Sequence, residues 1–136
     1  MRCLVDADVV LDVLADREPW VEHSARVLEL AERGAAEAFV AAHTVTTLHY
    51  LIRKHRDDAT ARRQVRLLLR LLGVVPVDED RLLQALDLPV DDFEDAVQAA
   101  CAEKRKVDVL VTRNVDDFAA LDIDVLSPVE LLARLD

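Results

Sequence analysis

Residues 2–14, Arg-Cys-Leu-Val-Asp-Ala-Asp-Val-Val-Leu-Asp-Val-Leu, decide the fold of this 136-residue chain. A short apolar run ends at Asp6, and apolar residues then follow at helical spacing: Val9, Val10, Val13 and Leu14. This change of period indicates a strand that runs directly into a helix. The carboxylate of Asp6 stands at the junction, where it either caps the helix or binds a ligand.

The remainder of the sequence repeats this change of pattern. Helices are predicted over residues 21–33, from Thr44 onward, and over 59–72, 79–86, 91–106 and from Ser127 onward. Short apolar runs predict further strands at residues 38–42, 74–77, 107–112 and 125–126. Pro76 has no N–H for a strand ladder, so residues 74–77 are expected at a sheet edge.

Particular residues mark the ends of these helices. Gly34 and Gly73 are the two glycines of the chain, and each follows a predicted helix. Thr44 is expected to cap the helix after the second strand. Ser127-Pro128-Val129-Glu130 matches a capping box with Pro at the first helical position.

Five short strands separated by helices predict an α/β fold, an open parallel sheet with helices on both faces. The length predicts one domain, residues 1–136. Apolar residues make up 52% of the chain, which excludes disordered and low-complexity classes. In such sheets, ligands bind beyond the carboxyl ends of the strands.

The net charge of −10 disfavours binding of a polyanion through bulk positive potential. Basic residues concentrate locally, because residues 53–70 contain seven of the 17 Lys and Arg. Arg62, Arg66 and Arg70 recur every four residues and therefore share one helical face. Such a stripe is either a contact for phosphates or an ordinary solvated helix face.

Four acidic positions are expected to meet at one edge of the sheet. Asp6 ends the first strand, Asp95 lies in the 91–106 helix, and Asp116 and Asp117 follow the 107–112 strand. Carboxylates brought together raise one another's pKa, and they persist only with a hard cation or shared protons. A Mg²⁺ or Mn²⁺ site is therefore the first hypothesis.

Three stretches resemble the signature stretches of the PIN domain in order and spacing: residues 6–12, 92–98 (Asp-Phe-Glu-Asp-Ala-Val-Gln) and 112–118 (Thr-Arg-Asn-Val-Asp-Asp-Phe). The similarity extends over nearly the whole chain, including Arg17-Glu18-Pro19 and Ser127-Pro128. The resemblance implies a three-layer α/β/α fold with sheet order 3-2-1-4-5. It also implies a metal-dependent ribonuclease similar to the VapC toxins of toxin–antitoxin pairs.

The resemblance further implies the roles of individual residues. Asp6 matches the first acidic ligand, Asp95 the acid on the later helix, and Asp117 the Asp of an Asp-Phe pair. These three are the expected catalytic residues and ligands of Mg²⁺ or Mn²⁺. Other residues would orient water or phosphate or contact RNA: Thr112, Arg113 and Asn114, and the stripe of Arg62, Arg66 and Arg70.

Two positions depart from the pattern of the family. Asn114 stands where many members have an Asp, which moves the expected ligand to Asp117. Thr47 stands where many members have a Glu, and Asp92, about one turn before Asp95, is the expected fourth ligand in its place. Asp92 is equally a candidate helix-start residue, and Asp91 with Glu94 also fits a capping box. Fewer carboxylates weaken metal binding.

Two other functions compete with a nuclease. If Thr47 and Asn114 remove activity, the same fold remains as a module that binds RNA or an antitoxin. Alternatively, Asp6 and Asp8 fit the nucleophile and acid of a phosphotransferase resembling the haloacid dehalogenase family. Against this second alternative, a Gly-rich flap is absent and the Lys expected after Thr112 instead precedes it.

Expected partners are an RNA substrate, a cognate antitoxin and a second copy of the chain in a homodimer, all from the resemblance. The antitoxin would lay an apolar helix between the 21–33 helix and the next one, with a basic side chain in the acidic pocket. Cys3 and Cys101 are expected to be small apolar side chains. With no signal-peptide pattern and no apolar run of about 18 residues, a cytoplasmic protein without a membrane span is expected.

Overall fold

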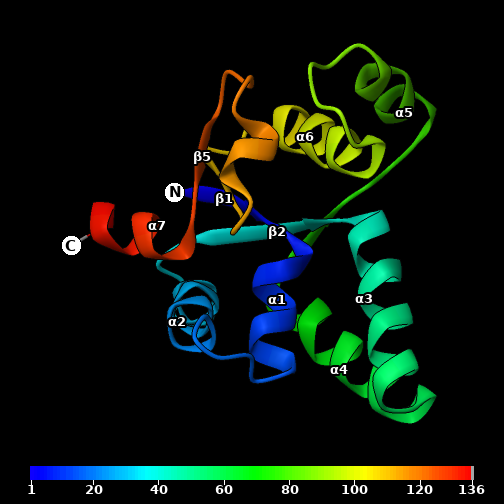
Figure 1. Ribbon diagram of the computed structural model, residues 1–136, viewed down its shortest axis with the longest axis vertical. Coiled ribbons are helices and arrows are strands. Elements are labelled where there is room, and N and C mark those ends of the chain that lie inside the picture. Colours follow the sequence, from blue (N-terminus) through cyan, green and yellow to red (C-terminus); the bar gives the residue numbers. More distant parts are fainter. Residues whose placement is uncertain (136) are drawn as a thin grey trace.

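A computed structural model describes residues 1–135 of the chain (Figure 1). The strands are β1 (Arg2–Val5), β2 (Glu37–Ala41), β3 (Gly73–Val75), β4 (Val109–Val111) and β5 (Asp124–Leu126). The helices are α1 (Ala7–Leu14), α2 (Val21–Glu32), α3 (Ala42–His55), α4 (Asp58–Leu71), α5 (Glu79–Leu86), α6 (Phe93–Arg105) and α7 (Pro128–Leu135), with a short 3₁₀ helix, η1 (Val115–Phe118).

The five strands form one all-parallel sheet in the order β3-β2-β1-β4-β5, which confirms the predicted architecture. β1 lies at the centre, where Cys3 pairs with Ala38 of β2 and with Val109 of β4. β3 is an edge strand, as Pro76 predicted, and it ends at Val75, before that proline. The carboxyl ends of β1 and β4 therefore lie side by side.

Helices cover both faces of the sheet because successive strand residues point to opposite faces. In β1, Leu4 is buried in a cluster with residues of α5, α6 and η1. Cys3 and Val5 belong instead to a cluster built with α1, α2, α3, α4 and α7. Figure 1 shows α5 and α6 on one side of the sheet and α1 to α4 on the other.

The junction between β2 and α3 has no intervening residue. β2 ends at Ala41 and α3 begins at Ala42, so the prediction that Thr44 caps this helix is wrong. Ala41 itself occupies the N-cap without a side-chain hydrogen bond, and Thr44 is buried in the first turn. A tight junction of this kind has no turn or capping residue to mark it in the sequence, because the apolar residues at the end of the strand also fit the start of a helix.

The other predicted helix ends are mostly confirmed. Gly34 has a φ of +74° directly after α2, where glycine avoids the steric cost of a left-handed conformation. Ser127 and Glu130 exchange the two hydrogen bonds of a capping box, at 3.1 and 3.2 Å, and Pro128 begins α7. At α6, however, the predicted capping box of Asp91 and Glu94 is wrong, because Asp92 is the residue that caps this helix.

Cys3 and Cys101 are buried free thiols, as their apolar surroundings predicted. Burial raises the pKa of each thiol to about 11, so both stay protonated at neutral pH. Among residues 1–135, no helix combines the length and the apolar character needed to cross a bilayer.

Replacement of Gly73 by Ala should destabilise the fold by about 1–3 kcal/mol, because it overpacks a tight contact. A Cβ at this position would lie 2.7 Å from Cδ1 of Phe39, and Phe39 is buried in β2 with Arg105 over its ring at 4.4 Å. Urea denaturation would measure the loss, with the exposed Val74→Ala as a control. A Gly73→Ala protein as stable as the wild type would show that the ring yields freely.

Candidate functional site

Asp6 lies between β1 and α1, at the carboxyl end of the central strand. Its backbone N–H donates to the carbonyl of Val111 at 2.9 Å, which extends the pairing of β1 with β4. Its Oδ1 accepts from the N–H of Ala7 at 2.7 Å and caps α1. The expected capping role is confirmed for Asp6, and the same contacts fix where its carboxylate stands.

Two buried neutral donors also hold the carboxylate of Asp6. Thr112, which follows β4, donates from its hydroxyl to Oδ2 at 2.8 Å. Gln98 of α6 donates from Nε2 to Oδ1 at 3.1 Å. The structure therefore brings the predicted residue Thr112 to Asp6. Gln98 was missed, because its place on the same helical side as Asp95 is a weak signal among buried residues.

Asp8 is a second carboxylate at this edge, which the sequence pattern indicated only as the acid of a phosphotransferase. Its Oδ2 accepts from the backbone N–H of Arg113 at 3.1 Å and from Nδ2 of Asn114 at 3.2 Å. Its Oδ1 is buried and has no hydrogen-bond partner among residues 1–135. Burial, with the charge of Asp6, raises the pKa of Asp8 to about 6.

Asp95 is half-buried near the start of α6, between two acidic cavities. Burial is the largest cause that raises its pKa to about 7, and the charges of Asp6, Asp92 and Asp117 add to it. Asp95 and Asp6 line one cavity, of about 40 Å³. Asp95, Asp92 and Asp117 line the other, of about 380 Å³. The structure thus gathers the predicted acids around Asp95.

The two acids on the second cavity with Asp95 differ in their local roles. Asp92 caps α6 by accepting from the N–H of Asp95 at 3.0 Å, and its side chain is exposed. Asp117 is exposed in η1. Asp116 also lines this cavity while remaining exposed, as a solvated helix-start residue should be. The carboxylate of Asp92 therefore lines the same cavity as Asp95 and also caps α6.

The cavity shared by Asp6 and Asp95 is also lined by residues of α3. Thr47 lines it, so the position expected to lack an acid does face the two carboxylates. The hydroxyl of Thr47 donates to the carbonyl of His43 at 3.2 Å. His43 in turn donates from Nε2 to the carbonyl of Glu94 at 3.0 Å and joins α3 to α6. Nothing in the sequence marks His43 for this role, because a bond across 51 residues leaves no local pattern.

The predicted basic contacts lie apart from this edge. The guanidinium of Arg113 donates to Asp12 at 2.9 Å and lies over the ring of Trp20 at 3.9 Å, while only its backbone reaches Asp8. In α4, Arg62 pairs with Asp58, and it shares an exposed face with the other two residues of the stripe, Arg66 and Arg70. Among residues 1–135, those that line the two acidic cavities include none from α4.

The donor atoms at this edge match the preferences of a hard divalent cation. They are carboxylate, hydroxyl and amide oxygens, and burial together with neighbouring carboxylates raises the pKa values of Asp8 and Asp95. Within residues 1–135, no three His, Cys, Asp or Glu side chains form a ready-made metal cage. Mg²⁺ needs none, because it typically binds one or two carboxylates and keeps several waters.

Solved structures share this fold. They include FitAcB from Neisseria gonorrhoeae (21% identity, TM-score 0.72, 93% of this chain and 97% of that chain covered). A toxin–antitoxin complex from Klebsiella pneumoniae matches at 19% identity with a TM-score of 0.69, covering 93% and 97%. Mycobacterium tuberculosis VapC20, described as a sarcin–ricin loop cleaving toxin, matches at 18% identity with a TM-score of 0.69, covering 87% and 94%.

The sequence comparisons agree with the fold. No curated protein sequence is significantly similar to this chain. The family model of the PIN domain matches residues 2–116, which include Asp6, Asp95 and Thr112. This chain belongs to the PIN domain family.

Proposed function

We propose that this chain is a divalent-metal-dependent ribonuclease and the toxin of a toxin–antitoxin pair, with residues 1–136 forming one domain. One observation carries the proposal: Asp6, Asp8 and Asp95 crowd together at the carboxyl edge of a parallel sheet, where burial and mutual repulsion raise two of their pKa values. A carboxylate cluster of this kind gains stability from a bound cation.

The chemistry follows from the residues at this edge. Asp6 and Asp95 would hold Mg²⁺ or Mn²⁺, with Asp117 and Asp92 on the adjoining cavity as further ligands. The bound cation supplies an activated water and stabilises charge on phosphate oxygens. Thr112 fixes the orientation of the Asp6 carboxylate through a neutral hydroxyl and not through a competing cation.

RNA is the proposed substrate because a structure with the same fold, VapC20, is described as cleaving the sarcin–ricin loop. Asn114 is exposed beside Asp8 and would orient a phosphate by a neutral hydrogen bond. Arg66 and Arg70 are exposed on α4 and would contact parts of an RNA that extend beyond the acidic edge. Arg113 would act through its backbone rather than its guanidinium.

Removal of divalent metal should abolish RNA cleavage. Purified protein would be incubated with structured RNA in Mg²⁺ or Mn²⁺, then with excess EDTA, and cleavage would be followed on denaturing gels. We expect cleavage only with metal and its recovery when metal is restored. Failure to cut RNA at any divalent-metal concentration would contradict the nuclease. The alternative of a binding module would then be favoured, with Thr47 and Asn114 as the cause.

An antitoxin partner is proposed from the toxin–antitoxin complex that shares this fold. Its helix was predicted to lie between α2 and α3, and in the structure α1 lies between these two helices and contacts both (Figure 1). An apolar groove of about 470 Å³ lies instead between α1, α3 and α4. A second groove of about 370 Å³, between α1, α2 and α4, adjoins it at Leu14 and Gln64.

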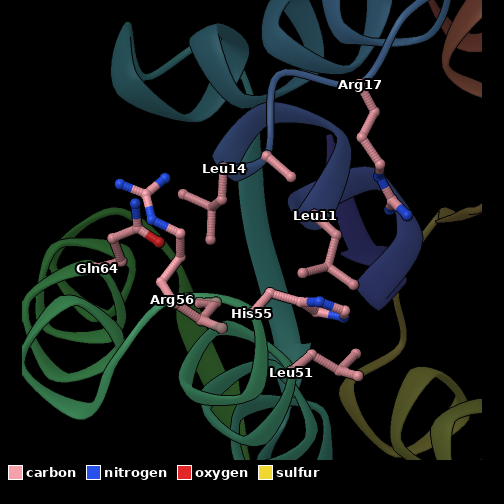
Figure 2. A pocket seen from close by; sticks show the side chains of 9 residues that line it. Leu11, Leu14, Arg17, Leu51, His55, Arg56 and Gln64 are labelled. Atoms are coloured by element: carbon pink, nitrogen blue, oxygen red, sulfur yellow. The ribbon is translucent and has the colours of Figure 1, made fainter.

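The first groove has features that suit an amphipathic helix. Figure 2 shows Leu11, Leu14 and Leu51 directed into it, with His55 and Arg56 beside them. The partner would therefore present apolar residues at helical spacing and an acidic residue near Arg56. A basic side chain of the same partner would occupy the acidic edge at Asp6 and Asp95, as the resemblance implies.

Replacement of Leu51 by Glu should weaken capture of the antitoxin encoded beside this chain at least tenfold, because a charge would be buried in an apolar groove. Tyr50→Glu is the matched control, since Tyr50 precedes it on α3 and is 60% exposed. Co-purification of the two proteins and calorimetric titration would measure the effect. If the two variants bound the antitoxin equally well, the antitoxin would not occupy the groove that Leu51 lines.

Two further proposals concern assembly and location. A homodimer is proposed because α5 exposes three leucines, Leu82, Leu83 and Leu86, the last of them 67% exposed. Light scattering would test this, and a monomeric mass at working concentrations would contradict it. A reducing cytoplasm is proposed because both cysteines are buried free thiols.

A further inference from the structure

Asp12 is a fully buried carboxylate that lies away from the acidic edge, in the second turn of α1. It accepts from Nε of Arg113 at 2.9 Å and from the hydroxyl of Ser24 at 3.1 Å. Arg17 lies 3.2 Å from its other oxygen. Asp12 thus joins α1 to α2, to the loop after α1 and to the turn after β4, all through one side chain.

Arg113 carries this connection to the candidate site. Its guanidinium is held between Asp12 and the ring of Trp20, and its backbone N–H donates to Asp8. The residues on either side of it, Thr112 and Asn114, donate to Asp6 and Asp8. The turn that orients both acids is therefore anchored from behind by the side chain of Arg113.

We propose that Asp12 is a positioning residue, which acts through Arg113 to hold the turn of residues 112–114 against Asp6 and Asp8. The inference rests on the proposed metal-dependent function of that edge. Burying a charge costs free energy, and an apolar pair of similar volume often stabilises a core equally well. Stability alone therefore does not explain why this ion pair is buried. The planar guanidinium of Arg113 binds Asp12 in a fixed direction, which an apolar pair cannot do, and so orients the turn of residues 112–114.

Two variants separate positioning from stability. Asp12→Asn removes the charge and keeps the size, whereas the double variant Asp12→Leu with Arg113→Met replaces the ion pair by apolar side chains. Asp124→Asn is the control, because it disrupts an exposed ion pair with Arg134 at 2.7 Å on β5, outside the acidic edge. Each protein would be examined by thermal melting, by titration with Mn²⁺ and by amide hydrogen exchange.

The inference predicts that Mn²⁺ affinity falls about 10- to 100-fold in both Asp12 variants, the range measured when outer partners of metal ligands are removed. The double variant should regain melting temperature without regaining affinity. Exchange at the N–H of Arg113, which is bonded to Asp8, should accelerate in both variants and not in Asp124→Asn.

Affinity that recovers together with melting temperature would overturn the inference, and so would unchanged exchange at Arg113. A wild-type protein that binds no Mn²⁺ would instead contradict the proposed function. Hydrogen exchange needs no metal, so in that case it would still decide whether Asp12 holds the turn.

Discussion

Replacement of Asp6 by Asn should lower metal-dependent RNA cleavage by at least about 100-fold and leave the fold intact. Removal of an outer partner of a metal ligand already costs about 10- to 100-fold, and Asp6 is proposed to bind the metal directly. Asn is as good a helix cap as Asp, so the bond to the N–H of Ala7 is retained. The loss should therefore appear in cleavage and not in melting temperature.

Asp116→Asn is the matched control for this experiment, because Asp116 is an exposed acid at the same edge that is not proposed as a ligand. Its cleavage should stay close to that of the wild type. Initial rates with excess metal would be compared for both variants, together with circular dichroism. Equal losses in Asp6→Asn and Asp116→Asn would mean that general negative charge, and not a defined ligand, supports cleavage.

Replacement of Leu4 by Ala should destabilise the protein by about 2–5 kcal/mol, the range for large-to-small changes in a core. Leu4 is fully buried in the central strand, between α6 and the neighbouring strands. A domain is typically stable by about 5–15 kcal/mol, so such a loss removes a large share of the total. Urea denaturation should show a lower midpoint with an unchanged slope.

Leu69→Ala provides the comparison, because Leu69 is a leucine of the same size that α4 leaves 45% exposed. Its stability should change by less than about 0.5 kcal/mol. If the two substitutions lowered the free energy of unfolding equally, burial in the sheet would not be the source of the stability contributed by Leu4.

The sequence predicted the sheet and the position of Asp6 because both depend on local period. A strand pattern that changes to a helical pattern at residue 6 is visible within ten residues, and parallel topology then fixes the edge. Thr112 was predicted on the same grounds, since it follows an apolar strand. The alternation in β1 likewise determines which side chains face each layer.

Residues whose roles depend on distant partners were not predictable. Gln98 bonds to Asp6 across 92 residues, and Asp12 bonds to Arg113 across 101. In the sequence alone, Gln98 and Asp12 occupy ordinary helix positions, because their partners come close only when the sheet forms. Leu69 is 45% exposed although it is as apolar as the buried Leu68 beside it, because only one face of α4 meets the core.

The two outer strands of the sheet have a consequence for how other chains can attach. β3 has three residues and is followed by Pro76, and β5 has three residues and begins with the charged Asp124. Short, charged or proline-blocked borders resist the addition of a further strand and so protect against edge-to-edge aggregation. A peptide that binds this protein is therefore expected to do so as a helix on its helical layers, not by β-augmentation.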